Sequence, residues 1–459
     1  MPDSYMEPSL TEPLVEDVPS EALTGSMRDF RKLHGSDLLD RVAPFYRWQE
    51  TRRHHGCWPY SKSTEEAPRP ICSAKDDAGH QFRGVNFASQ DYLGLASHPQ
   101  IKAAAKAAID EYGVHSAGSS ALAGNTKYSL ALEQCVADFL DLEHAILYPT
   151  GWAAGYGVIK GLVRPDDHIV MDGLAHACLQ EGAYSATGNV HLHGHLKLDA
   201  VRRLLRRIRA RDARNAILVV TESLFSMDSD TPDLAALQAL CREFDARLLV
   251  DAAHDLGCIG PDGRGHIGLQ QLLGKVDIVM GSFSKTFASN GGFVACRSAA
   301  VREYLKFYGC SATFSNALSP VQCATVLKAF EIVQSDEGRR LRERMLDRAV
   351  YLRSQLRAAG FEVIGEPSAI VPAVVGPEAL ARIVSRLLPS VGVVANLVEF
   401  PAVAKGNARF RLQVMATHSH ENIDDLVDAL RGATDAALSS YRRYNAVAAD
   451  QRCAHAIGA

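Results

Sequence analysis

Residues 279–287 read VMGSFSKTF, and the rest of the chain is organised around this stretch. The run from Val276 to Met280 predicts a buried strand that stops at a turn of small residues. Lys285 follows in that turn, so its amine is presented at the carboxyl end of the strand. Because burial disfavours the ammonium form, we expect the pKa of Lys285 to be lowered, which would make the amine a nucleophile or a base.

A second strand end, upstream, carries chemistry that fits such an amine. Leu249 and Val250 close another apolar run, and Asp251 and His254 follow it directly. A deprotonated lysine can form a Schiff base with pyridoxal phosphate, and an aspartate commonly pairs with the pyridinium nitrogen of that cofactor. Lys285 and Asp251 together therefore point to a pyridoxal-phosphate site.

The composition is that of an ordinary globular enzyme with a large core. The chain has 459 residues, of which 47% are hydrophobic and 22% charged, and its net charge is −4. That charge gives no support for a nucleic-acid partner, and the arginine-rich run 202–214 indicates one solvated helix face. The 10 cysteines show no CxxC pair and no His/Cys metal spacing, so we expect reduced thiols and no metal site.

The sequence also predicts where the protein resides. Met1 to Ala22 lacks the basic and then apolar pattern of a signal peptide. No apolar stretch approaches the ~18 residues that would span a bilayer. We therefore expect a cytoplasmic protein without a membrane span.

Three regions are expected along the chain. They are an N-terminal tail and amphipathic extension over 1–85, a large cofactor-binding domain over 86–335, and a small C-terminal domain over 336–459. Within the extension, residues 1–25 indicate a disordered tail and residues 27–53 an amphipathic helix.

The large domain shows strands that alternate with helical patterns. The strands are expected at 145–148, 169–171, 217–221, 248–251 and 276–280, and residues 293–296 add a candidate edge strand. This alternation, with near-continuous apolar strands, is typical of an α/β fold with a mostly parallel sheet. Short strands near 361–364 and 409–415, and helices near 378–388 and 423–437, then predict a small α+β domain whose end frays after Tyr441.

Ligands of open parallel sheets bind in the loops beyond the carboxyl ends of the strands. Four such loops carry useful groups here. Gly151 opens a helix whose N-terminus suits a phosphate, and the other three loops hold His176, Ser226, and Asp251 with His254. Any one of these groups would more often be a helix cap or a core histidine. Four of them, with Lys285 in a fifth loop, indicate a functional site.

The motifs carry a clear resemblance to a known family. The chain resembles the α-oxoamine synthases, which are fold-type I pyridoxal-phosphate enzymes, over roughly residues 86–435. The matching segments are DYLGL at 91–95 with HP at 98–99, TGWAA at 150–154, HA at 176–177, FSMD at 225–228, DAAH at 251–254, GRG at 263–265, SFSK at 282–285, FS at 314–315, and RFR at 409–411 with His418. The resemblance implies a large domain with a mostly parallel seven-stranded sheet and a small α+β C-terminal domain.

The resemblance also implies roles around the cofactor ring. Lys285 resembles the lysine that forms the internal Schiff base and removes the Cα proton. Asp251 would keep the pyridinium nitrogen protonated, while His254 and Ser226 would lie at the phenolic edge. His176 resembles the histidine that stacks on the ring and helps to hold the substrate carboxylate.

Further roles concern the phosphate and the substrates. Gly151, Trp152 and Ser282 would bind the phosphate, and Ser315 would do so from the neighbouring subunit of a homodimer that shares its active sites. Arg411 resembles the arginine that clamps the carboxylate of the amino acid, because its planar fork matches that group in two contacts. Gln90 is a further substrate-binding candidate.

The implied reaction is a decarboxylating Claisen-type condensation of serine, glycine or alanine with an acyl thioester. The thioester would be an acyl-CoA or an acyl carrier protein, the products an α-oxoamine, carbon dioxide and a free thiol. A role like that of serine palmitoyltransferase, or one in secondary metabolism, is favoured. Two rivals stay open: an aminotransferase or C–C lyase on the same fold, and a non-catalytic cofactor-binding partner subunit, against which Lys285 argues.

Several positions depart from the family pattern. Ala175 and Cys178 flank His176 where the family commonly has Asn or Ser and then Ser, Ala252 replaces an acidic residue, and Ser120 stands where several members have arginine. Gln90 also differs from many members. These changes leave the expected cofactor chemistry intact but weaken the transfer of substrate identity.

Overall fold

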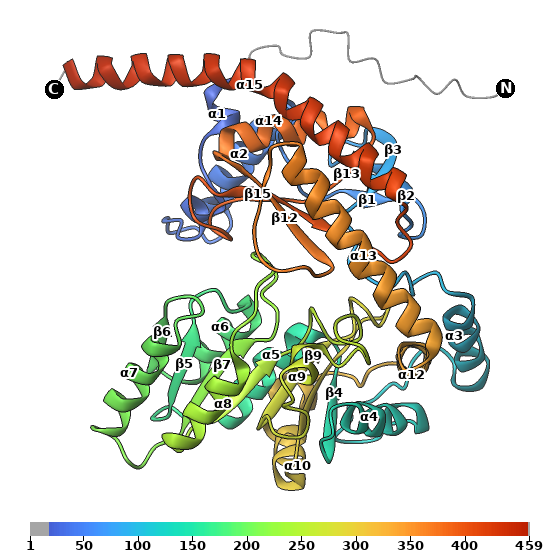
Figure 1. Ribbon diagram of the computed structural model, residues 1–459. Helices are drawn as coiled ribbons and strands as arrows, with labels where there is room; N and C mark the ends of the chain where they lie inside the picture. Colours follow the sequence, from blue (N-terminus) through green and yellow to red (C-terminus); the bar gives the residue numbers. More distant parts are fainter. Residues whose placement is uncertain (1–17, 458–459) are drawn as a thin grey trace. The chain divides into compact units, whose positions relative to one another are not determined.

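The computed structural model describes residues 18–457, with side chains described as far as residue 446 (Figure 1). The chain divides into two compact units. One is residues 90–346, and the other combines the chain before residue 90 with the chain from residue 347 onward. The regions expected from the sequence ended at 85 and 335, and the N-terminal extension was expected to stand apart from the C-terminal segment.

A seven-stranded sheet forms the middle of the unit 90–346, in the order β4-β10-β9-β8-β7-β5-β6. Its strands are β4 (His144–Tyr148), β5 (His168–Asp172), β6 (Val190–His193), β7 (Ile217–Glu222), β8 (Arg247–Asp251), β9 (Ile278–Ser282) and β10 (Gly292–Cys296). Only β10 runs against its neighbours. The predicted α/β fold with a mostly parallel seven-stranded sheet is therefore confirmed.

The strand expected at residues 293–296 is present as β10, but the prediction that it lies at an edge of the sheet was wrong. β10 pairs with β4 on one side and β9 on the other, so the edges are β4 and β6. All five residues of β10 are buried, which suits a central strand. The glycine pair before the strand signals only the tight return from β9, and it says nothing about the long-range partner β4.

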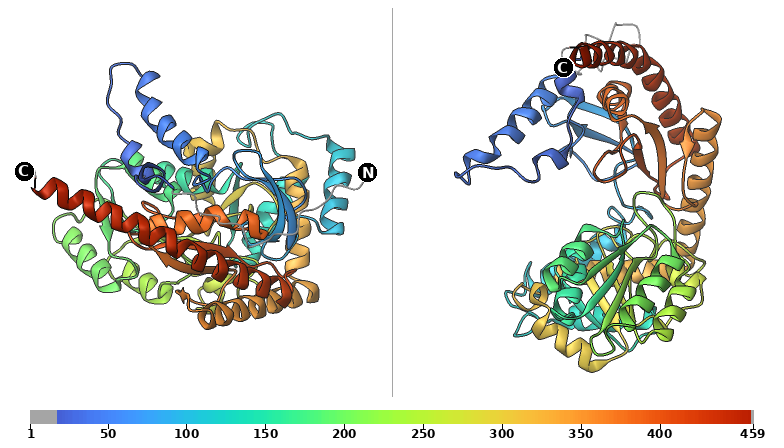
Figure 2. Two further views of the ribbon diagram at one scale, coloured as in Figure 1. Left: turned by 90° about the horizontal axis from the view of Figure 1, so that it is seen from above. Right: turned by 90° about the vertical axis from the view of Figure 1, so that its left-hand side faces the viewer.

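Helices cover both faces of this sheet (Figures 1 and 2). Alternate strand residues such as Ile146, Met171 and Met280 join one core with α5 and α6, and the residues between them face the other layer. The helices of the unit are α3 (Pro99–Tyr112), α4 (Lys127–Phe139), α5 (Gly151–Leu162), α6 (Ala177–Ala186), α7 (Leu198–Arg209), α8 (Leu234–Glu243), α9 (Gly265–Leu269), α10 (Ala299–Tyr308), α11 (Cys310–Thr313) and α12 (Pro320–Val333).

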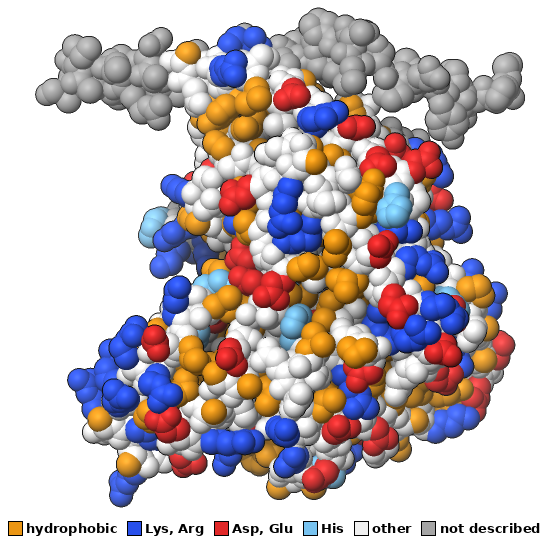
Figure 3. All heavy atoms as spheres, viewed as in Figure 1, with side chains coloured by type: hydrophobic (Ala, Val, Ile, Leu, Met, Phe, Trp, Pro, Cys, Tyr) orange, Lys and Arg blue, Asp and Glu red, His pale blue; other side chains and the backbone are white. Residues whose placement is uncertain are grey.

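The arginine-rich run lies on and after α7. Val201, Leu205 and Ile208 are buried, whereas the arginines between them point outward. Lys and Arg side chains accordingly gather over α7 in the space-filling view (Figure 3). The prediction of a solvated basic face is confirmed.

The second unit contains two four-stranded sheets. One has the order β1 (Ser63–Thr64), β2 (Ile71–Lys75), β3 (Gln81–Asn86), β13 (Val393–Val394), and the other β11 (Glu362–Val363), β12 (Ile370–Gly376), β15 (Ala408–Gln413), β14 (Leu397–Val398). Its helical elements are α1 (Ser20–Leu23), η1 (Met27–Phe30), η2 (Asp40–Val42), α2 (Ala43–His54), α14 (Glu378–Leu387), η3 (Pro389–Val391) and α15 (His420–Ile457), and α13 (Asp336–Ala358) contains the boundary between the units. The expected α+β pattern is present.

Three local expectations about the chain ends need correction. Residues 1–17 of the expected disordered tail lie outside the described residues, but α1 buries Ala22 and Leu23. The single helix expected over 27–53 is instead η1, η2 and α2. The expected frayed end after Tyr441 is helical, because α15 continues to Ile457. Contacts with residues far along the chain, which no local pattern reveals, order α1. Among the described residues, no helix is long and apolar enough to cross a membrane.

A buried cluster of charges holds the N-terminal segment in this unit. Glu399 lies between two arginines, with its Oε2 2.7 Å from Arg382 Nε and its Oε1 3.4 Å from Arg52 Nη1. All three side chains are at most 1% exposed. Arg382 also donates to the carbonyls of Leu23 and Gly25, which ties α1 and the following turn to α14.

The first prediction concerns this cluster. Glu399→Gln keeps the shape of the side chain but leaves two buried guanidinium groups without their counter-charge, which should lower the free energy of unfolding by about 3 kcal/mol. Urea unfolding followed by circular dichroism measures the change. The exposed Glu362→Gln is the matched control and should change stability little; equal stability of both variants would contradict the assignment.

Candidate active site

The carboxyl ends of the parallel strands gather polar side chains at one edge of the seven-stranded sheet. Asp172 ends β5, Glu222 ends β7, Asp251 ends β8 and Ser282 ends β9. Glu222 lies directly opposite Asp251 in the pairing of β7 with β8. This is the edge at which sheets of this kind bind ligands.

Lys285 lies in the loop after β9 and is half-buried. The loop is closed on itself, because the Phe283 N–H donates to the Gly291 carbonyl and the Ser289 N–H to the Phe283 carbonyl. Phe287 packs on Phe330 with 4.2 Å between the ring centroids. The loop is tight and is anchored by buried rings, so the backbone that carries the amine is fixed in position. The sequence predicted such a turn, with Lys285 in it, at the end of the strand.

Two buried carboxyls, Asp251 and Glu222, stand beside this amine. Burial raises the pKa of Asp251, and the nearby His176 and Lys285 partly oppose that rise. Burial also raises the pKa of Glu222 well above its ordinary range, and the neighbouring Asp251 raises it further. A cation brought to this edge would stabilise the ionised form of Asp251, as a protonated pyridinium nitrogen does.

His176 begins α6 as its N-cap and is exposed at this edge. Its Nδ1 accepts the Cys178 N–H at 3.3 Å and lies 3.0 Å from Cys178 Sγ. Because Nδ1 is an acceptor, Nε2 carries the proton of the neutral ring. The ring can therefore present a flat face and one donor to a ligand.

His254 lies on the loop after β8, three residues beyond Asp251, and is buried. Its Nδ1 is 2.8 Å from the hydroxyl of the fully buried Tyr92. Asp251 Oδ1 accepts the Ala253 N–H at 2.9 Å, so the start of the same loop is fixed. Tyr92 belongs to the DYLGL motif, but no role for it as the partner of His254 could be read from the sequence.

The start of α5 packs against the end of β9, and this arrangement, called the cradle below, is suited to an anion. Thr150 caps α5 by accepting the Ala153 N–H at 3.0 Å, and the first N–H groups of a helix point outward from its N-terminus. Gly151 lies so close to Ser282 that a Cβ on Gly151 would be 2.4 Å from Ser282 Cβ. Ser282 Oγ is 2.7 Å from Ser284 Oγ, which adds a second hydroxyl that the sequence analysis missed.

The remaining candidates of this unit lie on three other segments. Trp152 is 48% exposed and stacks on Tyr156 at 5.3 Å. Ser226 is buried in the loop between β7 and α8, and Ser315 follows α11. Gln90 is half-buried at the start of the unit.

Arg411 belongs to the other unit, on β15. His418, seven residues later, is buried there and stacks on Phe87 at 4.1 Å. The Met415 N–H donates to its Nδ1 at 3.0 Å, so Nε2 donates to the Asn86 carbonyl, also at 3.0 Å. Burial lowers the pKa of His418 to about 4. This histidine is neutral and holds β3 to the loop after β15.

Pyridoxal phosphate fits the residues of the unit 90–346. The amine of Lys285, the carboxyl of Asp251 and the small-residue cradle at Gly151 would meet its aldehyde, its ring nitrogen and its phosphate. Glu222 is the chief residue that the sequence analysis left without a role. Its position at a strand end beside Asp251 could be foreseen only from the strand order.

The comparisons with known proteins agree with this fit. The family model for aminotransferases of class I and II matches residues 83–430. The 8-amino-7-oxononanoate synthase of Geotalea daltonii is 36% identical over 342 residues, which cover 74% of this chain and 86% of that protein. The serine palmitoyltransferase of Sphingobacterium spiritivorum is 35% identical over 365 residues, or 79% of this chain and 90% of that protein. A solved serine palmitoyltransferase from S. paucimobilis with a bound PLP–myriocin aldimine is 26% identical, with a TM-score of 0.81 over 87% of this chain and 99% of its own.

The second prediction tests the cradle. Gly151→Ala places a methyl group 2.4 Å from Ser282 Cβ, so Ser282 must shift and the cradle must narrow. We expect the affinity for pyridoxal phosphate to fall about tenfold or more, since a loss of 1.4 kcal/mol in binding is tenfold. Absorbance titration of the apoprotein measures it. Gly188→Ala, whose methyl group would meet open space, is the control; unchanged affinity in Gly151→Ala would exclude this phosphate site.

The third prediction concerns His418. Its pKa of about 4 lies below the ordinary value of about 6.5, so the unfolded chain binds more protons between these pH values. The contribution of neutral His418 to the free energy of unfolding should therefore be fully present above pH ~6.5. It should be lost as the pH drops toward ~4, by up to about 3 kcal/mol. Urea unfolding at several pH values measures this. As the pH is lowered, the free energy of unfolding should fall more steeply for the wild type and for the exposed control variant His34→Gln than for His418→Gln. Equal slopes would show that His418 is not the group responsible.

Proposed function

The chain belongs to the aminotransferase class I and II family and, within it, to the pyridoxal-phosphate-dependent acyltransferases called α-oxoamine synthases, and on that premise we propose that it condenses an α-amino acid with an acyl thioester. The products are an α-oxoamine, carbon dioxide and a free thiol. The amino acid is serine, glycine or alanine, and the donor is an acyl-CoA or an acyl carrier protein.

One observation carries the proposal: a loop-anchored lysine stands beside a pair of buried carboxyls at a strand edge that also has an anion cradle. Lys285 lies near enough to Asp251 and Glu222 for its charge to oppose the rise of both pKa values. Gly151, which follows β4, and Ser282, at the end of β9, form the cradle at the same edge of the sheet. Amine, carboxylate and phosphate site are the three groups that this cofactor requires of a protein.

Three side chains of this site have separate roles in the proposed reaction. Pyridoxal phosphate, when bound, supplies an electron sink that stabilises negative charge at the Cα atom of the amino acid. Asp251 holds a proton on the ring nitrogen, and Lys285 takes the proton from Cα. His176 presents its Nε2–H, which can donate to the carboxylate of the amino acid.

Other residues orient the reactants. His254, held by Tyr92, and the buried Ser226 would fix the phenolic edge of the ring. Gly151, Trp152 and Ser282 would hold the phosphate. Arg411, which lies in the other unit, stays our prediction for the residue that binds the amino-acid carboxylate, and Gln90 for a further substrate contact.

We also propose that the enzyme is a homodimer in which Ser315 reaches the phosphate of the neighbouring subunit. The residue before it, Phe314, is 87% exposed in the single chain. An exposed phenylalanine next to the proposed phosphate ligand is what a partner subunit would cover.

A substrate panel tests the reaction. Purified protein is supplied with pyridoxal phosphate, each candidate amino acid and acyl-CoAs of several lengths, or acyl carrier proteins, while thiol release is followed and products are identified by mass spectrometry. We expect a thiol and a ketone product with at least one pair. Formation of the pyridoxamine form of the cofactor, or release of glycine without thioester consumption, would instead indicate an aminotransferase or a C–C lyase. A protein that binds the cofactor and turns over none of these substrates would be a partner subunit.

The fourth prediction isolates the lysine. Lys285→Ala should abolish turnover and the covalent attachment of the cofactor after borohydride reduction, because no other amine is held by the same loop. Peptide mass spectrometry locates the attachment. Lys275→Ala, which removes an exposed lysine from the same unit, should behave as the wild type. Full activity of Lys285→Ala, or attachment at another lysine, would remove this assignment.

A further inference from the structure

We propose that His195 is a positioning residue for the cofactor site, because it ties together the two loops that present His176 and Ser226. His195 lies in the segment between β6 and α7 and has no place among the residues that the proposed function uses. The inference rests on that function, since His176 and Ser226 are its proposed ring contacts. It adds a residue that acts through both of them.

The first tie runs through Asp172, at the end of β5. His195 Nδ1 is 3.0 Å from Asp172 Oδ1, and this carboxylate is 1% exposed. The Leu174 N–H donates to Oδ1 and the Leu196 N–H to Oδ2, each at 2.9 Å. Asp172 therefore fixes both the segment that carries His195 and the loop that leads to His176.

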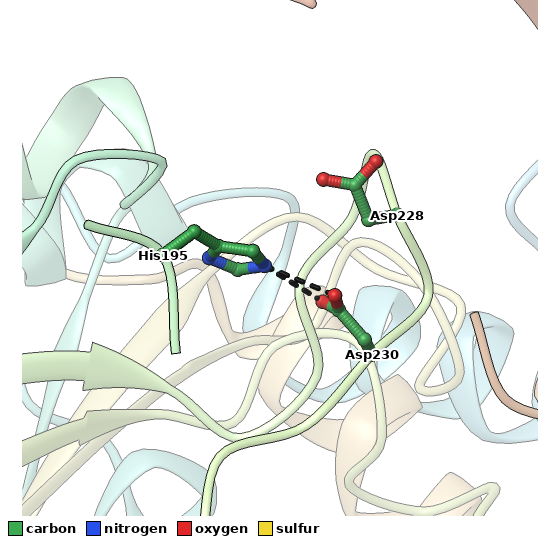
Figure 4. A group of neighbouring side chains, drawn as sticks. All are labelled: His195, Asp228 and Asp230. Carbon is green, nitrogen blue, oxygen red and sulfur yellow. Dashed lines mark hydrogen bonds and ion pairs between the residues drawn. The ribbon is translucent and has the colours of Figure 1, made fainter. Parts of the chain in front are cut away.

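The second tie runs through Asp230, in the loop between β7 and α8. His195 Nε2 is 3.1 Å from Asp230 Oδ1 and 3.0 Å from Oδ2 (Figure 4). The Phe225 N–H donates to the Asp230 carbonyl and the Ser229 N–H to the Phe225 carbonyl, both at 2.9 Å, so residues 225–230 close into a tight turn. Ser226 lies inside that turn, and the rings of His195 and Phe225 pack edge to face with 4.6 Å between their centroids.

The charge of His195 suits this double tie. Both ring nitrogens face carboxylate oxygens, and a ring that donates from both nitrogens is the imidazolium form. Burial alone would lower the pKa of His195, but the hydrogen bonds and charges of Asp172 and Asp230 outweigh it and raise the pKa to about 10. With both nitrogens donating to carboxylates, the bonds at both ends of the clamp are charge-assisted.

A metal ion is the competing occupant of this place. His195, Asp228 and Asp230 each offer a ligand atom, and these atoms lie within 4.8 Å of one another. An ion would need Nε2 without its proton, so ion and proton exclude each other. In Figure 4 the bonds run from the ring to Asp230. Both ring nitrogens already face carboxylate oxygens at hydrogen-bond distance, and this geometry favours a protonated ring over a bound ion.

The closing experiment cuts one arm of the clamp. In His195→Asn the amide can still reach Asp172 in place of Nδ1 but cannot reach Asp230. We expect the affinity for pyridoxal phosphate to fall about tenfold, or 1.4 kcal/mol of binding free energy. We also expect the absorbance spectrum of the bound cofactor to shift, because the loops that carry Ser226 and His176 are no longer tied to each other. Asp230→Asn, which keeps the shape and loses the charge, should change both in the same direction by less.

His168→Asn is the matched control. His168 begins the strand that Asp172 ends, and its Nε2 is 3.1 Å from Asp212 Oδ2, so this variant removes a comparable pair from the opposite end of β5. It should lower the melting temperature but leave cofactor affinity and spectrum unchanged. If His195→Asn is too unstable to purify, the comparison of Asp230→Asn with His168→Asn decides the question.

Three outcomes would count against the inference. Wild-type affinity and spectrum in folded His195→Asn and Asp230→Asn would overturn it, and so would an equal loss of affinity in His168→Asn, since the clamp would then act only on stability. A rise in the melting temperature of the wild-type apoprotein with Zn²⁺ or Mn²⁺, absent from His195→Asn, would replace the clamp by a metal site. A wild type that fails to bind pyridoxal phosphate at all would instead refute the proposed function.

Discussion

The structure depends above all on two buried carboxyls that meet side by side where β7 and β8 end. Glu222 and Asp251 are 3% and 6% exposed and lie opposite each other in the sheet. Two negative charges so placed in a medium of low dielectric cannot both be ionised without cations nearby. The parallel strands that put these residues at one edge also put the lysine loop, the histidine cap of α6 and the N-terminus of α5 there. Fold and charge thus call for the same kind of ligand: one with a cationic ring and an anionic tail.

Much of this was within reach of the sequence, because the decisive residues follow apolar strands directly. The ends of β5, β8 and β9 were found from hydrophobic runs, and strand ends of a parallel sheet meet at one edge whatever the strand order. Features that depend on the order of the strands in the sheet were missed or predicted wrongly. The place of β10 between β4 and β9, and the juxtaposition of Glu222 with Asp251, are pairings between distant segments. The ordering of α1 rests likewise on Arg382, which follows it by several hundred residues.

The two units use buried charge in different ways. In the unit that contains Glu399, the charges are paired with one another: two arginines share the carboxylate of Glu399. The indole rings of Trp48 and Trp58 also lie beside Arg52. Such a cluster fixes which segments meet, and removal of one member leaves the others unpaired. Both ring nitrogens of His418 likewise form hydrogen bonds with backbone groups of its own unit. These groups hold segments of their own unit together.

The carboxyls at the sheet edge can be sorted by the same criterion. Asp255 hydrogen-bonds Ser223 Oγ at 2.7 Å and pairs with His266 Nδ1 at 2.9 Å, and Asp172 is paired with His195. Each of these has a polar or cationic side chain within hydrogen-bond distance. Asp251 accepts the backbone N–H of Ala253, and Glu222 accepts that of His176. Lys285 opposes the rise in the pKa of both Asp251 and Glu222, which supports our proposal that the ring of the cofactor binds beside this pair.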